Sequence, residues 1–394
     1  MTRGRVKAAK RHGETKSLVE TMNRTKNSTK HLAILSQAVL ADGDSNHFDL
    51  VAPQVVHRDR EPFSQISFTF SAQDFSELWA LANSHHVIMR AFPNLDRARW
   101  KGSSDWVEWI DQAVYKERAR VLHALSFLFP ICQALEEAGD VIVIKSLDHW
   151  ADLGSDLDLY TNADADRVVA IMRQHFKAHV AERSWGDRLA NKWNFVVPGL
   201  PELVEVHVAR LGQTGEQTAI TPSLLARAGT EQFGRHTFRV PAPEDRMIIS
   251  TLQRMYRHFY LRLCDVVDNA KLVDSGAVDY GYLRSSAMRA GLWDGLASYL
   301  AIVSGYVKSY RGEGLPLPPL VTTAAKFGNE LVRFKRNFLR VPIFPQAASL
   351  YLSEWKRLFL NGEIQGALRL SLLPGLATAA ALELKLTGSD KGIW

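Results

Sequence analysis

The spacing of apolar residues divides the chain into a helical first part, a strand-rich middle and a helical last part. The stretch "SQISFTF" alternates apolar and polar residues as a strand does, and Ser71 with Asp74 forms a capping-box pattern before "AQDFSELWALANSHHV". Residues 104–140 then repeat apolar positions at helical spacing. Pro130 is expected to bend or split this long helix, and Gly139 is typical of a helix C-cap.

Strand patterns gather in the middle of the chain. "VIVIK" predicts a buried strand, and Asp164 is placed to cap a helix over "ADRVVAIMRQHF". "KWNFVV" and "ELVEVHV" predict two strands joined by a turn at Pro198–Gly199, and "HTFRV" predicts a further one. From Glu244 onward the pattern is helical again, beginning with one long helix over "EDRMIISTLQRMYRHFYLRLCDVVDNAKLVDSG".

This order of elements predicts an α+β fold in which helical regions flank a small sheet. The chain has 394 residues, which is long for a single core, so several packed units are expected. We divide it into a basic, disordered leader, a mainly helical N-terminal region, an α/β core, a helical domain and a C-terminal helical extension, at residues 1–45, 46–139, 140–240, 241–312 and 313–394.

Charge changes this picture only at the N-terminus. Residues 1–30 carry nine Lys and Arg against Glu14 and Glu20, so a chain of net charge +6 is close to neutral elsewhere. We expect a solvated leader, with contact to an acidic polymer or organelle targeting as alternatives. The near-neutral remainder argues against sequence-specific DNA binding, which normally needs a basic surface.

Other features indicate a cytoplasmic protein. The first residues lack the apolar segment of a secretory signal, and no run of 18 apolar residues predicts a spanning helix. Cys132 and Cys264 lie in apolar helical patterns and are expected to be reduced core residues. The C-terminal stretch "LVRFKRNFLRVPIFP" mixes basic and aromatic residues, so peripheral membrane contact stays open beside packing within the fold.

The stretch "IKSLDHWADLGSDLDLY" carries the first candidate chemistry. Leu157 and Leu159 point to one face of a strand, so Asp156 and Asp158 share the other face, about 6–7 Å apart along the chain. Carboxylates in this arrangement can converge on Mg²⁺. Ser146 directly follows the strand "VIVIK", where a small hydroxyl side chain can approach phosphates.

The strand "LVEVHV" repeats this alternation. Its valines share one face, so Glu205 and His207 share the other. A third carboxylate on a neighbouring strand would complete a set able to hold two metal ions. His207 is expected either to face the site as a base or phosphate donor, or to serve as a structural partner of Glu205.

In this order the features resemble the nucleotidyltransferase superfamily with the DNA polymerase β-like fold, and in particular its uncharacterised bacterial members. The resemblance covers roughly residues 65–305 and rests on "VIVIKS", "GSDLDLY", "VEVHVARL" and "RLCDVVDNAKLVDSGAVDYGYL". It implies a small mixed-sheet core that transfers a nucleoside monophosphate from an NTP to an acceptor and releases pyrophosphate. It also implies Mg²⁺, or Mn²⁺, held by Asp156, Asp158 and Glu205, with Glu205 able to help deprotonate the acceptor. Nucleotide contacts would come from Lys145, Ser146, Gly154, Ser155 and His207.

The chain departs from the family pattern in its phosphate loop. Either Lys145 replaces the usual glycine beside the serine, or Ser146 replaces the glycine after the family lysine. The arginine often found before the acidic strand is also absent, and Leu153–Gly154 stands there instead. A catalytically silent scaffold or binding protein with this fold, possibly in peripheral contact with a membrane, therefore remains the alternative.

Several residues have open interpretations. Asp148 and Asp152 are expected to be polar loop residues, and His85–His86 is assigned no role. The residues Arg254, Arg257, His258, Arg262, Asp265 and Asp268 would form either an ion-paired helix surface or one wall of a nucleotide pocket. The choice among ATP, CTP, GTP and UTP, and an acceptor that is a small molecule, a protein or tRNA, also stay open.

Overall fold

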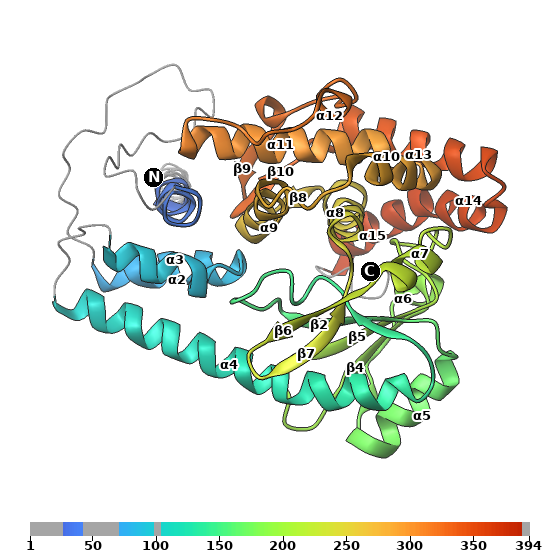
Figure 1. The fold of residues 1–394 in the computed structure, drawn as a ribbon, viewed down its shortest axis with the longest axis horizontal. Coiled ribbons are helices and arrows are strands. Elements are labelled where there is room, and N and C mark those ends of the chain that lie inside the picture. The colour runs from blue at the N-terminus through green and yellow to red at the C-terminus, as the bar shows by residue number, and fades with distance from the viewer. Residues whose placement is uncertain (1–26, 42–70, 98–103, 388–394) are drawn as a thin grey trace, which may run out of the picture.

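The computed structural model describes residues 27–41, 71–97 and 104–387. These residues form an α+β fold with a small mixed sheet, which confirms the predicted class (Figure 1). The predicted strand "SQISFTF" and the most basic part of the leader lie outside the described residues.

The N-terminal helices begin earlier than the sequence predicted. Residues 27–40, assigned to the disordered leader, form a helix whose Leu32, Leu35 and Leu40 are buried in the larger apolar core. The Ser36 hydroxyl lies 2.7 Å from the Tyr306 hydroxyl, which ties this helix to the far end of the chain. The leader boundary at residue 45 is therefore wrong for this segment, because its apolar face is covered by other helices.

Three further helices follow within the described residues of the N-terminal part. They are α2 (Ala72–Ser84), α3 (Ile88–Arg97) and α4 (Ser104–Glu136). The capping box of Ser71 and Asp74 is confirmed at the start of α2. Pro130 lies inside α4 without splitting it, so one long helix runs beneath the sheet in Figure 1.

The sheet has five strands in the order β1-β2-β5-β4-β3. Strands β2 and β5 pair in parallel, while the other neighbours are antiparallel. The strands are β1 (Val141–Val143), β2 (Asp156–Thr161), β3 (His179–Val180), β4 (Lys192–Val196) and β5 (Leu203–Val208). Between them lie the helix α5 (Ala165–Phe176), which Asp164 caps as predicted, and α6 (Trp185–Ala190). Apolar residues of α4, α5 and the strands form a second core.

A short helix and a hairpin follow the sheet. They are α7 (Thr221–Arg227) and the antiparallel pair β6 (Gly229–Phe233) and β7 (His236–Val240), which confirms the strand predicted for "HTFRV". The hairpin lies against α4 through Phe233 and Phe238, which belong to the same apolar core as α4.

The long helix predicted from Glu244 is wrong. The chain forms α8 (Pro243–Thr251) and a π-helical segment η1 (Leu252–His258), leaves the helix at Phe259 with φ +54°, and passes through β8 (Tyr260–Leu261) before α9 (Leu263–Asp274). The break occurs because β8 pairs with β10 (Phe338–Arg340), which lies far along the chain. Arg254 and Arg262 therefore lie on different elements.

The C-terminal part packs over α8 and α9 in Figure 1. Its helices are α10 (Tyr280–Ala290), α11 (Trp293–Arg311), α12 (Pro319–Thr322), α13 (Ala348–Leu360), α14 (Ile364–Ser371) and α15 (Leu373–Thr387). Two single turns, η2 (Asn329–Leu331) and η3 (Ile343–Ala347), lie between them. The extension is not wholly helical, because its basic-aromatic stretch forms β9 (Arg333–Lys335) and β10 of a three-stranded sheet.

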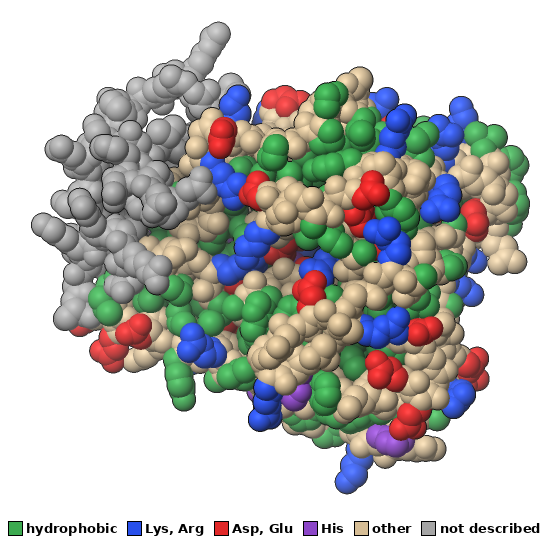
Figure 2. All heavy atoms as spheres, in the orientation of Figure 1, with side chains coloured by type: hydrophobic (Ala, Val, Ile, Leu, Met, Phe, Trp, Pro, Cys, Tyr) green, Lys and Arg blue, Asp and Glu red, His purple; other side chains and the backbone are tan. Residues whose placement is uncertain are grey.

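The structure can be compared with the expectations for surface charge, for membrane-spanning helices and for the two cysteines. Figure 2 shows Lys and Arg side chains interspersed with Asp and Glu over the visible face. Among the described residues, no helix combines the length and the hydropathy that crossing a membrane requires. Cys132 and Cys264 are both buried and free, as predicted.

Candidate functional site

The two acidic strands lie side by side at the centre of the sheet. Parallel pairing of β2 with β5 sets Asp158 opposite Glu205. The apolar residues that alternate with them, such as Leu157 and Val204, are fully buried in the core between the sheet and α4. The predicted alternation is therefore confirmed, and the register places the carboxylates on the same side of neighbouring strands.

A polar cavity of about 180 Å³ opens on this side of the sheet. One wall consists of the loop after β1 and the acidic strands; it includes Lys145, Ser146, Gly154, Ser155, Asp156, Asp158 and Glu205. The facing wall comes from η1, β8 and the start of α9, and includes Gln253, Arg254, Arg257, His258, Tyr260 and Arg262. We call these the acid wall and the arginine wall.

Seven of the eight predicted site residues thus line one cavity. The eighth, His207, lines a smaller cavity beside it together with Lys145 and Arg257. Its Nε2 lies 2.8 Å from Glu205 Oε1, which is the structural partnership left open by the sequence.

The acid wall contains a donor set suited to a divalent cation. Ligand atoms of Asp158, Glu205 and His207 all lie within 4.8 Å of one another. Asp156 is the next residue on the same face of β2, and burial together with Asp158 and Glu205 raises its pKa to about 6. Carboxylate oxygens so close together favour a bound cation, because the cation offsets their mutual repulsion.

Two lysines already neutralise part of this charge. Lys145 Nζ forms an ion pair with Asp158 and lies 3.5 Å from Glu205 Oε1, and Lys192 Nζ lies 3.0 Å from Glu205 Oε2. Burial would raise the pKa of Glu205, but Lys145 and Lys192 outweigh it and hold the pKa well below its usual value. A metal ion at Asp158 and Glu205 would therefore have to displace the ammonium group of Lys145.

The arginine wall contains buried N–H donors without hydrogen-bond partners among the described residues. Arg254 is 1% exposed; its Nε lies 2.8 Å from Asp265 Oδ2, but its Nη1 has no hydrogen-bond partner among the described residues. The same holds for Nε of Arg262. Burial and the nearby Arg257 and Arg254 lower the pKa of His258 to about 2. Buried donors of this kind point to an anion, since an unpaired buried donor is costly.

The Ser146 hydroxyl forms two hydrogen bonds with the protein backbone. Its hydroxyl donates to the carbonyl of Asp156 at 3.0 Å and accepts from the amide of Asp158 at 2.7 Å. The side chain is buried, and these two hydrogen bonds hold the loop against β2 at the edge of the cavity. Lys145 beside it has φ +59°, a left-handed conformation that favours glycine.

The rest of this loop is anchored by buried ion pairs. Asp152 accepts from the amide of Met89 at 2.7 Å and from Nε of Arg90 at 2.9 Å. Arg90 also pairs with Asp268 of α9, and Asp268 in turn contacts Nδ1 of His149. Asp152 thus lies in a loop as expected, and it is buried and anchors that loop. The same network fixes the acid wall relative to α9.

Sequence reasoning missed the role of the paired histidines. His85 accepts from the amide of Leu263 at 2.8 Å, and its other ring nitrogen lies 2.7 Å from the carbonyl of Asn337. It therefore links the end of α2 to α9 and to the turn before β10. His86 contacts Arg262 Nη1 at 2.7 Å and stacks on His149. The partners are distant in sequence, so no local spacing could have indicated them.

Comparison of the chain with protein-family models, with curated proteins and with solved structures found no match.

Proposed function

We propose that this protein is a Mg²⁺-dependent nucleotidyltransferase that binds an NTP between the acid wall and the arginine wall. The observation that carries the proposal is the facing arrangement itself: three carboxylates on adjacent strands stand across one cavity from three arginines. A triphosphate with its metal ion needs both kinds of group, cationic donors for the phosphate oxygens and carboxylates for the metal.

The donor set fits the metal. Asp158 and Glu205 would hold Mg²⁺ or Mn²⁺ through oxygen atoms, with Asp156 beside them on β2. The ion would neutralise the negative charge that develops on the phosphates during transfer. Nε2 of His207 forms a hydrogen bond with Oε1 of Glu205, and this contact orients the carboxylate.

The residues of the arginine wall would bind and orient the triphosphate. Arg254 and Arg262 have unsatisfied donors, and no ion pair holds Arg257 within the described residues. An acceptor oxygen would attack the α-phosphorus while the bond from that phosphorus to the bridging oxygen breaks, and pyrophosphate would leave. Where the acceptor is a hydroxyl, its proton would pass to a carboxylate of the acid wall.

Calorimetric titration tests this function directly. Each NTP is titrated with and without Mg²⁺ into the wild type, Asp158→Asn and the control Asp166→Asn, whose carboxylate is exposed on α5. We expect Mg²⁺ to strengthen NTP binding to the wild type and the control but not to Asp158→Asn. Incubation with α-labelled NTP and a cell extract then identifies the labelled acceptor. NTP binding that ignores both Mg²⁺ and Asp158 would refute the proposal.

One observation favours the alternative of a catalytically silent protein. The ammonium group of Lys145 contacts Asp158 and Glu205, where a metal ion would bind. A lysine fixed there would allow NTP or another anion to bind the arginine wall without metal. In that case Mg²⁺ would leave NTP affinity unchanged, and no fraction of the extract would become labelled.

A further inference from the structure

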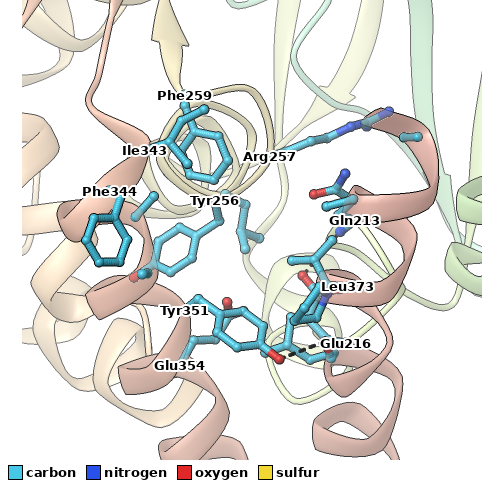
Figure 3. Close-up of a pocket in the computed structure, with 17 residues that line it drawn as sticks. Gln213, Glu216, Tyr256, Arg257, Phe259, Ile343, Phe344, Tyr351, Glu354 and Leu373 are labelled. Carbon is cyan, nitrogen blue, oxygen red and sulfur yellow. Dashed lines mark hydrogen bonds between the residues drawn. The ribbon is translucent and has the colours of Figure 1, made fainter. Parts of the chain in front are cut away.

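A second and larger cavity, of about 530 Å³, lies beside the polar one (Figure 3). Its size falls in the usual range for small-molecule sites. The C-terminal helices α13, α14 and α15 close it against η1, so the extension builds a binding space. Most lining side chains are apolar; among them are Leu252, Phe259, Phe344, Ala348, Leu373 and Ala377.

Three polar side chains of this cavity are already engaged, whereas the Tyr256 hydroxyl has no hydrogen-bond partner among the described residues. Glu354 accepts from Gln217 Nε2 at 2.7 Å, Glu216 accepts from the amide of Thr214 at 2.8 Å, and the Tyr351 hydroxyl donates to a backbone carbonyl at 3.3 Å. Burial and the neighbouring Glu216 raise the pKa of Glu354 well above its usual value. A nucleobase would find few free partners here, whereas an apolar chain needs none.

Arg257 connects the two cavities. It lines the apolar cavity and also the arginine wall of the polar one. Figure 3 shows it at the opposite end of the apolar cavity from Glu354 and Tyr351. A ligand whose apolar part fills the larger space would therefore present its other end to a cationic side chain beside the proposed NTP site.

The apolar cavity is also accessible from outside. Ile343 and Phe344, which lie at its edge, are 65% and 82% exposed. Large exposed apolar side chains at a cavity entrance suit a ligand that carries its own apolar surface.

We infer that the apolar cavity binds the acceptor, an amphiphile with a phosphate monoester at the end of an alkyl-type or prenyl-type chain. This inference rests on the proposed function, since the phosphate would meet the NTP at Arg257. An oxygen of that monoester would bond to the α-phosphorus as the bond to pyrophosphate breaks, giving a nucleoside diphosphate ester of the amphiphile. A dianionic phosphate carries no proton that must be removed.

Dodecyl phosphate below its micelle concentration is the probe. Isothermal titration should show one saturable site in the full chain. Each methylene removed should weaken binding about fourfold, so decyl phosphate should bind about 15-fold more weakly than dodecyl phosphate. Arg257→Gln should weaken dodecyl phosphate binding at least tenfold but leave dodecanol binding unchanged.

Two filling variants and a matched control locate the site. Ala348→Trp and Ala377→Trp add an indole to the cavity from different helices, and Ser349→Trp adds it at an exposed neighbouring position of α13 that does not line it. Both filling variants should lose dodecyl phosphate binding at least tenfold, and the control should keep it. Ala377 lies on an exposed surface, so its variant should fold even if Ala348→Trp does not.

The outcomes separate this inference from the proposed function. Dodecyl phosphate binding without Mg²⁺–NTP binding would leave the cavity assignment standing and refute the transferase. Mg²⁺–NTP binding with no saturable dodecyl phosphate site would refute the acceptor alone. Loss of NTP binding in Ala377→Trp would show that the cavity holds the base and would overturn the inference.

Discussion

The ion pair of Lys145 with the acid wall makes the sharpest prediction, because the same residue opposes metal binding and supports the fold. Lys145→Met removes the ammonium group and keeps a side chain of similar length. Its partners Asp158 and Glu205 are only 13% and 11% exposed, so their charges are left largely buried. Removing one partner of a buried pair typically costs about 3–5 kcal/mol.

The free energy of unfolding that Lys145→Met loses should lie at or below the lower end of that range. Glu205 keeps Lys192 at 3.0 Å and His207 at 2.8 Å, so Asp158 bears most of the change. We expect the free energy of unfolding to fall by about 2–3 kcal/mol without divalent cations. Mg²⁺ should then bind the variant more tightly than the wild type, and at 100 times its dissociation constant it should restore about 2.7 kcal/mol.

Urea unfolding followed by tryptophan fluorescence measures both effects. The wild type, Lys145→Met and the exposed control Lys116→Met are unfolded in EDTA and in a Mg²⁺ series. The control should match the wild type throughout. Equal stabilisation of wild type and Lys145→Met by Mg²⁺, or none in either, would contradict the view that the lysine and the metal share one position.

Three further predictions follow from the buried contacts. Arg254→Met should destabilise the protein by about 3–5 kcal/mol because it removes the ion-pair partner of the buried Asp265. Adding Asp265→Asn should recover part of this loss in urea unfolding, and strictly additive losses would argue against the pair. Burial opposes charging of His149, but Cys264 and Asp268 raise its pKa well above the usual value of about 6.5, so its ion pair stabilises the fold at pH 6 and weakens progressively as the pH rises. His149→Gln should therefore lower the urea midpoint more at pH 6 than at pH 9, and a loss independent of pH would refute this. A chain begun at residue 46 should melt at a lower temperature than one begun at residue 27, because the helix 27–40 and its buried leucines are gone. Equal melting of the two chains in calorimetry would contradict that packing.

The acidic face of the sheet could be predicted from the chain alone. A strand has a period of two, so Leu157 and Leu159 in the core require Asp156 and Asp158 on the opposite face. The same rule places Glu205 opposite the buried valines of β5. Local signals such as the capping box at Ser71 and the cap at Asp164 were equally reliable, because donor and acceptor lie within one turn.

The elements that depend on distant partners could not be predicted in this way. The run after Glu244 has a helical pattern throughout, yet Leu261 pairs with Leu339, and that pairing ends the helix at Phe259. The buried face of the helix 27–40 is covered by residues near position 306. Its neighbours in the sequence are basic and polar, so the local pattern did not predict that this helix is buried. In both cases tertiary contacts outweigh local propensity.

The sequence by itself determined which residues are acidic, which face of each strand they share, and that the fold is α+β. Only the tertiary structure decided what stands across from them: it turned the arginines of η1 and β8 into the opposite wall, and set Lys145 between Asp158 and Glu205. It also closed the apolar cavity with helices from the C-terminus. Periodicity orients a side chain relative to its own strand or helix, whereas a cavity is defined by the packing of several elements that no short stretch of sequence encodes.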